Sequence, residues 1–181
     1  GNIARSAWLA AGLPLTVPGV TVDRQCGSSQ QALHFAAQAV MSGTQDVVIA
    51  GGVQTMTQVP ISSAMLAGQA LGFADPFSGS KGWQARFGDA PVSQFHAAQR
   101  IAEHWKLSRE AMEAYALQSH QRAAAAIEGG RFAREIVPCE GVMQDETPRP
   151  DTTRAKMAAL EPLMPGSALT AAVSSQTADA A

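Results

Sequence analysis

The sequence predicts a layered α/β unit followed by a loop-rich stretch and a mainly helical region. Three observations lead to this prediction. Residues 1–52 alternate between helical and strand-like patterns, residues 53–90 lose that periodicity among many glycines and prolines, and residues 93–129 show two helical patterns in succession. We expect the middle stretch to be a long loop, and long ordered loops tend to carry function.

The first part of the chain predicts a helix, a strand, a second helix and a second strand. The first helix ends at Gly12-Leu13-Pro14, because glycine and proline are helix stop signals. Val17–Val22 is rich in valine and threonine and predicts a short strand. A second helix follows Cys26 and ends at Gly43, with apolar residues at helical spacing, namely Leu33, Ala36, Ala37 and Val40. Asp46–Ala50 predicts the second strand.

Two longer helices are predicted after residue 92. The first covers Ser93–Lys106. Ser108 has the position of an N-cap for the next helix, with Glu110 in the first turn, where the helix dipole favours negative charge. This helix ends at Gly129-Gly130. A single stripe along it predicts core packing, and the stripe consists of Met112, Tyr115, Ala116, Ser119, Ala123 and Ile127.

The last third of the chain contains shorter predicted elements. Glu135–Cys139 predicts a strand, and Thr153–Leu160 predicts a short helix. Ala168–Val173 predicts an extended segment that re-enters the sheet.

Composition excludes several classes of function. The 181 residues carry a net charge of −2 and the pI is about 6.1, so no nucleic-acid partner is expected. No apolar run is long enough to cross a membrane, and no signal peptide is visible, so no membrane association is expected. Cys26 and Cys139 lie far apart, without a Cys-x-x-Cys motif or clustered histidines. We therefore predict no disulfide framework, no metal site and a reducing, cytoplasmic location.

Cys26 is the candidate nucleophile. It lies where a strand-like run gives way to a helix, so it would meet unpaired backbone N–H groups and the positive end of the helix dipole. Both favour the thiolate, which is the nucleophilic form. Gly27, Ser28 and Ser29 leave room for a reacting group to approach. Position and composition alone leave two interpretations open, an acyl-cysteine nucleophile and a small buried structural residue. We interpret Cys139, after an apolar run, as a structural thiol.

Two motifs resemble the thiolase family. The first is Cys26-Gly27-Ser28-Ser29, and the second is Gly51-Gly52-Val53-Gln54-Thr55-Met56 after the predicted strand. Thiolases carry Cys-Gly-Ser-Gly or Cys-Gly-Ser-Ser at the acylated cysteine, with a Gly-Gly-Met-Glu-Ser-Met-like segment downstream. The resemblance implies a thiolase-like layered αβα core. It places a partial core with the nucleophile helix at 1–53, a loop domain covering CoA at 54–169 and the return to the core at 170–181. It also implies that both ends are cut and that the C-terminal thiolase domain is missing.

The resemblance also implies the chemistry. Cys26 would take an acyl group from a 3-oxoacyl-CoA, and its backbone N–H would help to form an oxyanion hole. CoA thioesters would be the substrates, with no permanently bound cofactor. Ser175 corresponds to a serine near the pantetheine of CoA, and Arg149 to an arginine near the adenine. Arg149 could instead be a solvated loop charge, and Ser175 could also be a helix N-cap before Gln176.

None of the four histidines matches the general base of the family; they are His34, His96, His104 and His120. That base, a second cysteine and an oxyanion-hole asparagine belong to the C-terminal half of thiolases. We therefore expect the isolated segment to be inactive.

Several positions depart from the common thiolase pattern. Ser93-Gln94-Phe95 stands where many thiolases have His-Met-Gly, and Lys156 stands where some have a serine near CoA. Ala171-Ala172-Val173-Ser174-Ser175 replaces Ala-Gly-Asn-Ala-Ser. These positions border the acyl or pantetheine channel, so specificity for straight chains is not expected. A combination of segments looks more like actinobacterial thiolases that shorten steroid side chains, namely Val53-Gln54, Asp75-Pro76-Phe77, Lys81-Gly82-Trp83 and Ser93-Gln94-Phe95.

Other classes of protein remain as alternatives. A ketoacyl synthase also uses an acyl-cysteine, but it usually has a Thr-Ala-Cys-like approach and lacks the inserted loop. A non-catalytic thiolase-like lipid- or sterol-binding protein or scaffold could keep the fold, although the retained Cys26 argues against it. A papain-type hydrolase lacks its histidine and asparagine context here. By resemblance, the full-length protein would be a homodimer or homotetramer.

Overall fold

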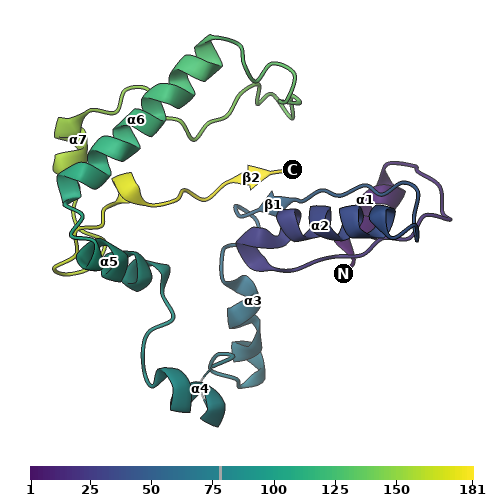
Figure 1. Ribbon diagram of the computed structural model, residues 1–181, viewed down its shortest axis with the longest axis horizontal. Helices are drawn as coiled ribbons and strands as arrows, with labels where there is room; N and C mark the ends of the chain where they lie inside the picture. The colour runs from purple at the N-terminus through teal and green to yellow at the C-terminus, as the bar shows by residue number, and fades with distance from the viewer. Residues whose placement is uncertain (78) are drawn as a thin grey trace. The chain divides into compact units, whose positions relative to one another are not determined.

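The computed structural model describes residues 1–77 and 79–181 and divides the chain into two compact units (Figure 1). The first unit consists of Gly1–Gln58 and Asp179–Ala181, and the second consists of Val59–Ala178. The predicted domain boundaries, at 53/54 and 169/170, stay predictions.

Helices make up most of the regular structure in the described residues. They are α1 (Ile3–Ala10), α2 (Ser28–Met41), α3 (Ser63–Leu66), α4 (Lys81–Phe87), α5 (Gln94–His104), α6 (Arg109–Glu128) and α7 (Arg154–Ala158). Three 3-10 turns join them, η1 (Gln25–Gly27), η2 (Ala67–Leu71) and η3 (Ala171–Val173). The strands β1 (Gln54–Thr55) and β2 (Asp179–Ala180) pair antiparallel, with Gln54 opposite Ala180.

In the first unit, polar side chains of α1 bind the segment that follows it. Asn2 caps α1 by accepting a hydrogen bond from Arg5 N at 3.1 Å, and its amide donates to the Gly19 carbonyl at 2.6 Å. The Arg5 guanidinium donates to the carbonyls of Leu15, at 2.7 Å, and Val17. These bonds use backbone carbonyls that a strand would offer to a neighbouring strand.

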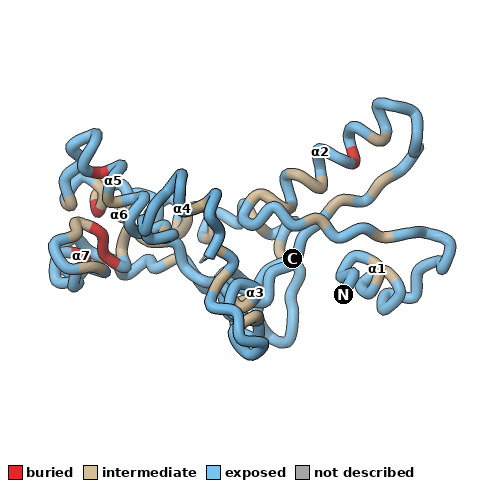
Figure 2. The backbone as a smooth tube through the Cα atoms, turned by 90° about the horizontal axis from the view of Figure 1, so that it is seen from below, coloured by how far each residue is buried: buried red, intermediate tan, exposed pale blue. Residues whose placement is uncertain are grey.

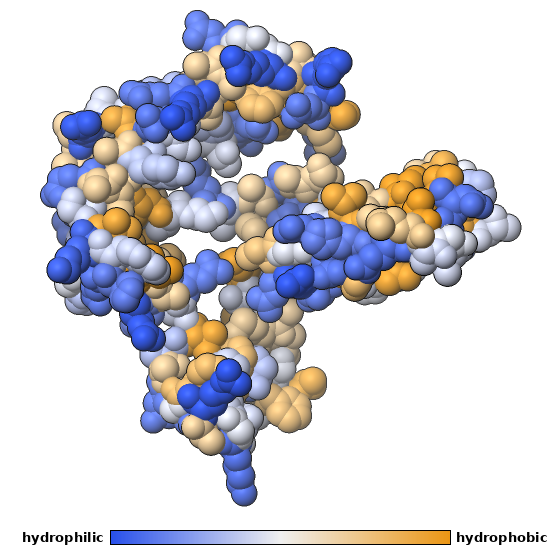
Figure 3. All heavy atoms as spheres, viewed as in Figure 1, coloured by the Kyte–Doolittle hydropathy of each residue, from blue (hydrophilic) through white to orange (hydrophobic). Residues whose placement is uncertain are grey.

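The two strands predicted in the first unit are wrong. Val17–Val22 and Asp46–Ala50 form no strand in the structure. Extended segments become strands only where a second backbone pairs with them, and the described residues supply no such partner. Val47 and Ile49 are accordingly 85% and 76% exposed. Figure 3 shows apolar side chains at the surface over α1 and α2, and those of α2 include Leu33, Phe35 and Met41.

The return of the chain to the first unit is fixed by one carboxylate. Thr57 N donates to Asp179 Oδ1 at 2.9 Å, beside the β1–β2 pair. The backbone and side-chain hydrogen bonds from Thr57 lower the pKa of the Asp179 carboxyl below its usual range.

The helices predicted in the second unit are confirmed, and each begins at a side-chain cap. The hydroxyl oxygens accept hydrogen bonds from backbone N–H groups three residues later, Ser93 from His96 at 3.4 Å, Ser108 from Ala111 at 3.2 Å and Thr153 from Lys156 at 3.2 Å. Such caps satisfy donors that the first helical turn leaves unpaired.

The stretch predicted as a loop, 53–90, contains short helices instead, so that prediction is wrong for α3, η2 and α4. These helices are too short for apolar residues to recur at helical spacing, so the sequence pattern does not predict them. Around α4, Trp83 stacks between Phe77 and Phe87, with ring centroids 4.4 Å and 4.6 Å away. These aromatic contacts give the segment a small packed centre.

Four further predictions are wrong in the second unit. Glu135–Cys139 is not a strand, because Cys139 bridges to Val142 across a tight turn in which Glu140 has φ 47°. Cys139 is therefore exposed, which contradicts its interpretation as a buried structural thiol. Tyr115 is 77% exposed, so it does not belong to the buried face of α6. In Ala168–Val173, Thr170 bridges to Pro162, but the chain then turns into η3 instead of joining a sheet.

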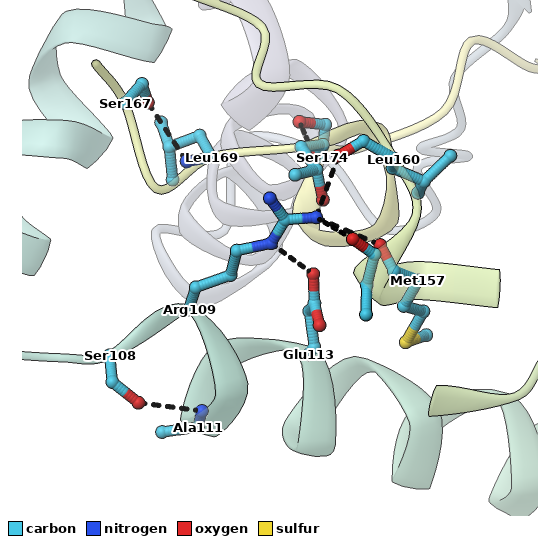
Figure 4. Close-up of polar contacts among 11 residues, drawn as sticks. Ser108, Arg109, Ala111, Glu113, Met157, Leu160, Ser167, Leu169 and Ser174 are labelled. Carbon is cyan, nitrogen blue, oxygen red and sulfur yellow. Dashed lines mark hydrogen bonds and ion pairs between the residues drawn. The ribbon is translucent and has the colours of Figure 1, made fainter. Parts of the chain in front are cut away.

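The buried centre of the second unit forms around Arg109, at the start of α6 (Figure 4). Its Nε donates to Glu113 Oε1 at 2.7 Å, and its Nη2 donates to the carbonyls of Met157, Ala158 and Leu160 at 3.1, 3.1 and 2.8 Å. Glu113 is only 6% exposed. Figure 2 shows how few residues are buried, and α7 and the segment after it hold several of them, Met157, Leu169 and Thr170.

Arg109→Met is expected to destabilise the second unit, because it leaves the Glu113 carboxylate buried and unpaired and removes the Arg109 donor from the carbonyls of Ala158 and Leu160. Removing one partner of a buried ion pair typically costs about 3–5 kcal/mol. Urea denaturation of the purified protein measures this loss. Arg122→Met, at an exposed position of the same helix, is the matched control and should change stability little. Equal unfolding midpoints for the two variants would contradict the assigned role of Arg109.

Candidate active site

The candidate nucleophile Cys26 lies in the turn η1, directly before α2. The residue before it, Gln25, has φ 50°, a left-handed conformation that is uncommon for a residue other than glycine. The Asp23 carboxylate supports this turn by accepting a hydrogen bond from Gln25 N at 2.9 Å. The left-handed residue thus turns the chain sharply into the helix at the thiol.

The Ser28 hydroxyl fixes the same turn from its other side. It accepts a hydrogen bond from Arg24 N at 2.9 Å and donates to the Gln25 carbonyl at 2.7 Å. The Arg24 guanidinium donates to Gln31 Oε1 at 2.6 Å, and Gln31 lies in the first turn of α2. These bonds hold the backbone on both sides of Cys26, while the residue itself remains exposed.

The structure brings the two sequence motifs together. Gly52 lies so close to Ser29, in the first turn of α2, that a Cβ atom on Gly52 would overlap with the Ser29 hydroxyl. Glycine at position 52 therefore permits the Gly51-Gly52 segment to approach the start of the helix that follows Cys26.

Arg149 and Ser175 lie on neighbouring segments of the second unit. Arg149 N donates to His120 Nδ1 at 3.2 Å, and Arg149 Nη2 lies 3.5 Å from Gln176 Oε1. Gln176 Nε2 donates to the Thr147 carbonyl at 2.9 Å. Ser175 is exposed, and the interpretation of its hydroxyl as an N-cap is wrong because no helix follows it.

Charge around Arg149 leaves its guanidinium available to an anion. Lys156 Nζ donates to Asp151 Oδ2 at 2.7 Å, and this hydrogen bond, with the charge of Lys156, lowers the pKa of the Asp151 carboxyl. Arg149 adds a smaller attraction to Asp151. Within residues 1–77 and 79–181, the only hydrogen-bond contact of the Arg149 guanidinium is to the neutral amide of Gln176.

The whole chain, residues 1–181, matches the family model described as the N-terminal domain of thiolase. The chain belongs to the thiolase family. As a thiolase N-terminal domain, it has the α/β fold of that family.

Named relatives agree with this assignment. The chain is 58% identical, over 185 aligned positions, to the steroid 3-ketoacyl-CoA thiolase FadA6 of Mycobacterium tuberculosis, covering 100% of this chain and 45% of that protein. It is 39% identical to a 3-ketoacyl-CoA thiolase of Saccharophagus degradans and 41% identical to one of Shewanella putrefaciens, in each case over 99% of this chain and 46% of the relative. The predicted resemblance to thiolases, including steroid thiolases, is confirmed. The chain spans less than half the length of these relatives.

The parts of the candidate site lie in different units of this thiolase domain. Cys26 belongs to the first unit, and Arg149 and Ser175 belong to the second. Sequence reasoning missed the residues that hold these positions, namely Asp23, Arg24, Ser28, Gln31, His120 and Gln176. Asp23 and Ser28 could have been found, because aspartate two residues before a turn and serine at a helix start are local signals.

The described part of this thiolase domain meets neither the requirements of a metal cluster nor those of a membrane-spanning helix. Those residues contain no group of three or more metal-ligating side chains. Among them, no helix combines the length and the apolar character required to cross a bilayer.

Both thiols of the folded protein segment are expected to react with a thiol reagent, because Cys26 and Cys139 are exposed. Titration of the native 181-residue chain with Ellman's reagent should release two equivalents without denaturant. Cys26→Ala and Cys139→Ala should each remove one equivalent. Release of a second equivalent only after denaturation would show that one of the thiols is buried.

Proposed function

We propose that, in the full-length protein, Cys26 carries the acyl group in a degradative thiolase reaction on 3-oxoacyl-CoA substrates. The Cys26 thiolate attacks the 3-oxo carbon, and the bond between C2 and C3 breaks. Its electron pair stays on C2, which takes up a proton to give acetyl-CoA. The thiolate of a second CoA then attacks the cysteine thioester, which releases the shortened acyl-CoA and regenerates Cys26.

The proposal rests on the position of the Cys26 thiol. This thiol is exposed and lies in a hydrogen-bonded turn directly before a 14-residue helix, and the chain matches a thiolase N-terminal domain over its whole length. The start of a helix favours negative charge, both on a thiolate and on the oxygen of a tetrahedral intermediate. The backbone N–H of Cys26 is the proposed donor to that oxygen. Exposure gives an acyl-CoA access to the sulfur.

Arg149 and Ser175 are the proposed contacts to CoA. The Arg149 guanidinium can pair with phosphate and stack on adenine. The Ser175 hydroxyl can bond a pantetheine amide. We propose that the segment 54–169, which contains Arg149, is the loop domain that covers CoA.

The name of the M. tuberculosis relative supports a steroid-derived acyl chain as the substrate class. We further propose a cytoplasmic homodimer or homotetramer without a permanently bound cofactor.

Brief exposure of the full-length protein to acetoacetyl-CoA should add an acetyl group to the peptide that contains Cys26, as read by mass spectrometry. Cys26→Ala should abolish this adduct and lower thiolysis at least ~10³-fold, because the nucleophile is lost. Cys139→Ala is the matched control and should keep both adduct and activity. An adduct confined to Cys139 would favour a non-catalytic thiolase-like protein that binds lipid.

The isolated 181 residues should turn over little or no acetoacetyl-CoA, even though they contain Cys26. In thiolases the general base and the second cysteine, which protonates the leaving carbanion, belong to the C-terminal half. Thiolysis assays of the segment and of the full-length protein, at equal concentration, test this expectation. Comparable turnover by the two would contradict it.

A further inference from the structure

Gln176 is bonded to both ends of the short segment that carries Arg149. Its Nε2 donates to the Thr147 carbonyl at 2.9 Å, and its Oε1 faces Arg149 Nη2 at 3.5 Å. A single side-chain amide can do both, because it has a donor end and an acceptor end. Its backbone directly follows Ser175. The amide therefore links the segment carrying the guanidinium to the segment carrying the serine hydroxyl.

A second side chain holds the same segment from α6. Arg149 N donates to His120 Nδ1 at 3.2 Å, a bond that fixes the backbone of Arg149 and does not involve its guanidinium. An arginine on an exposed loop loses much side-chain entropy when it binds a ligand. Gln176 already restricts the Arg149 side chain, so less entropy is lost when the ligand binds. Because the Gln176 amide is neutral, it does this without neutralising the charge of Arg149.

We propose that Gln176 is a positioning residue that aligns the Arg149 guanidinium, relative to Ser175, for the nucleotide end of CoA. This role rests on the proposed function of Arg149 and Ser175 as CoA contacts. Gln176 itself touches the Arg149 segment and needs no contact with the reacting atoms. It lowers the KM for CoA and does not change the rate of the reaction at Cys26.

The test uses the full-length enzyme and two acceptor thiols, CoA and N-acetylcysteamine, which has the pantetheine end but no nucleotide. Gln176→Ala should raise the KM for CoA about three- to tenfold, the effect of one or two lost neutral hydrogen bonds, and leave kcat within about twofold. With N-acetylcysteamine, neither constant should change by more than about twofold. A merely structural role would impair both thiols alike, and that result would overturn the proposal.

Two further variants make the result specific. Gln176→Glu keeps an acceptor for Arg149 but loses the donor to Thr147, and its charge competes with phosphate for the guanidinium. It should raise the KM for CoA at least as much as Gln176→Ala does. In an Arg149→Ala background, Gln176→Ala should have no further effect, because the two residues act through one contact. If the two substitutions instead raise the KM for CoA independently, so that their factors multiply in the double variant, the proposal is contradicted.

Gln144→Ala is the matched control, since Gln144 is an exposed glutamine of the preceding loop. It should leave all constants unchanged. If the wild-type full-length protein neither binds nor uses CoA, the proposed function fails, and the positioning role fails with it. If the wild type is active and Gln176→Ala has the KM of the wild type for CoA, only the positioning role fails.

Discussion

The packing of the second unit depends on the Arg109 guanidinium. Five N–H donors in a fixed plane allow one side chain to satisfy Glu113 and the carbonyls at the end of α7 together. Met157 O also accepts from Leu160 N at 3.0 Å, but among the described residues Arg109 is the donor to the carbonyls of Ala158 and Leu160, which a helix end leaves without an intrahelical partner. The segment carrying Arg149 lies just before α7, and the segment carrying Ser175 follows η3. The Arg149 segment is therefore attached to the helix whose end Arg109 binds.

The two parts of the candidate site are held in different ways. Around Cys26 the bonds are local, since Ser28 contacts residues three and four positions earlier and Arg24 reaches seven residues ahead. Around Arg149 the bonds join residues 27 and 29 positions apart. A turn held by local bonds needs little of the fold in order to form. A segment held by distant residues takes its shape only when the whole unit is folded.

This difference explains what the sequence predicts well. The helices follow from local signals, and the predicted cap Ser108 is confirmed. The strand predictions fail, because pairing depends on a partner backbone that no local pattern reveals. Exposure of Cys139 depends on the turn at Glu140, which an apolar run before the cysteine does not indicate. The family motif predicts Cys26 as the nucleophile, without help from the fold. No pattern in the sequence marks Gln176, because its partners lie 27 and 29 residues away.

The contact between Gly52 and Ser29 links two motifs that are more than twenty residues apart in the chain. A methyl group at position 52 would occupy the place of the Ser29 hydroxyl, so that hydroxyl would have to rotate away. The sizes of the side chains at positions 29 and 52 are thus coupled. A sequence library for altered specificity near the nucleophile should therefore vary positions 29 and 52 together, because any side chain at position 52 requires the Ser29 side chain to move.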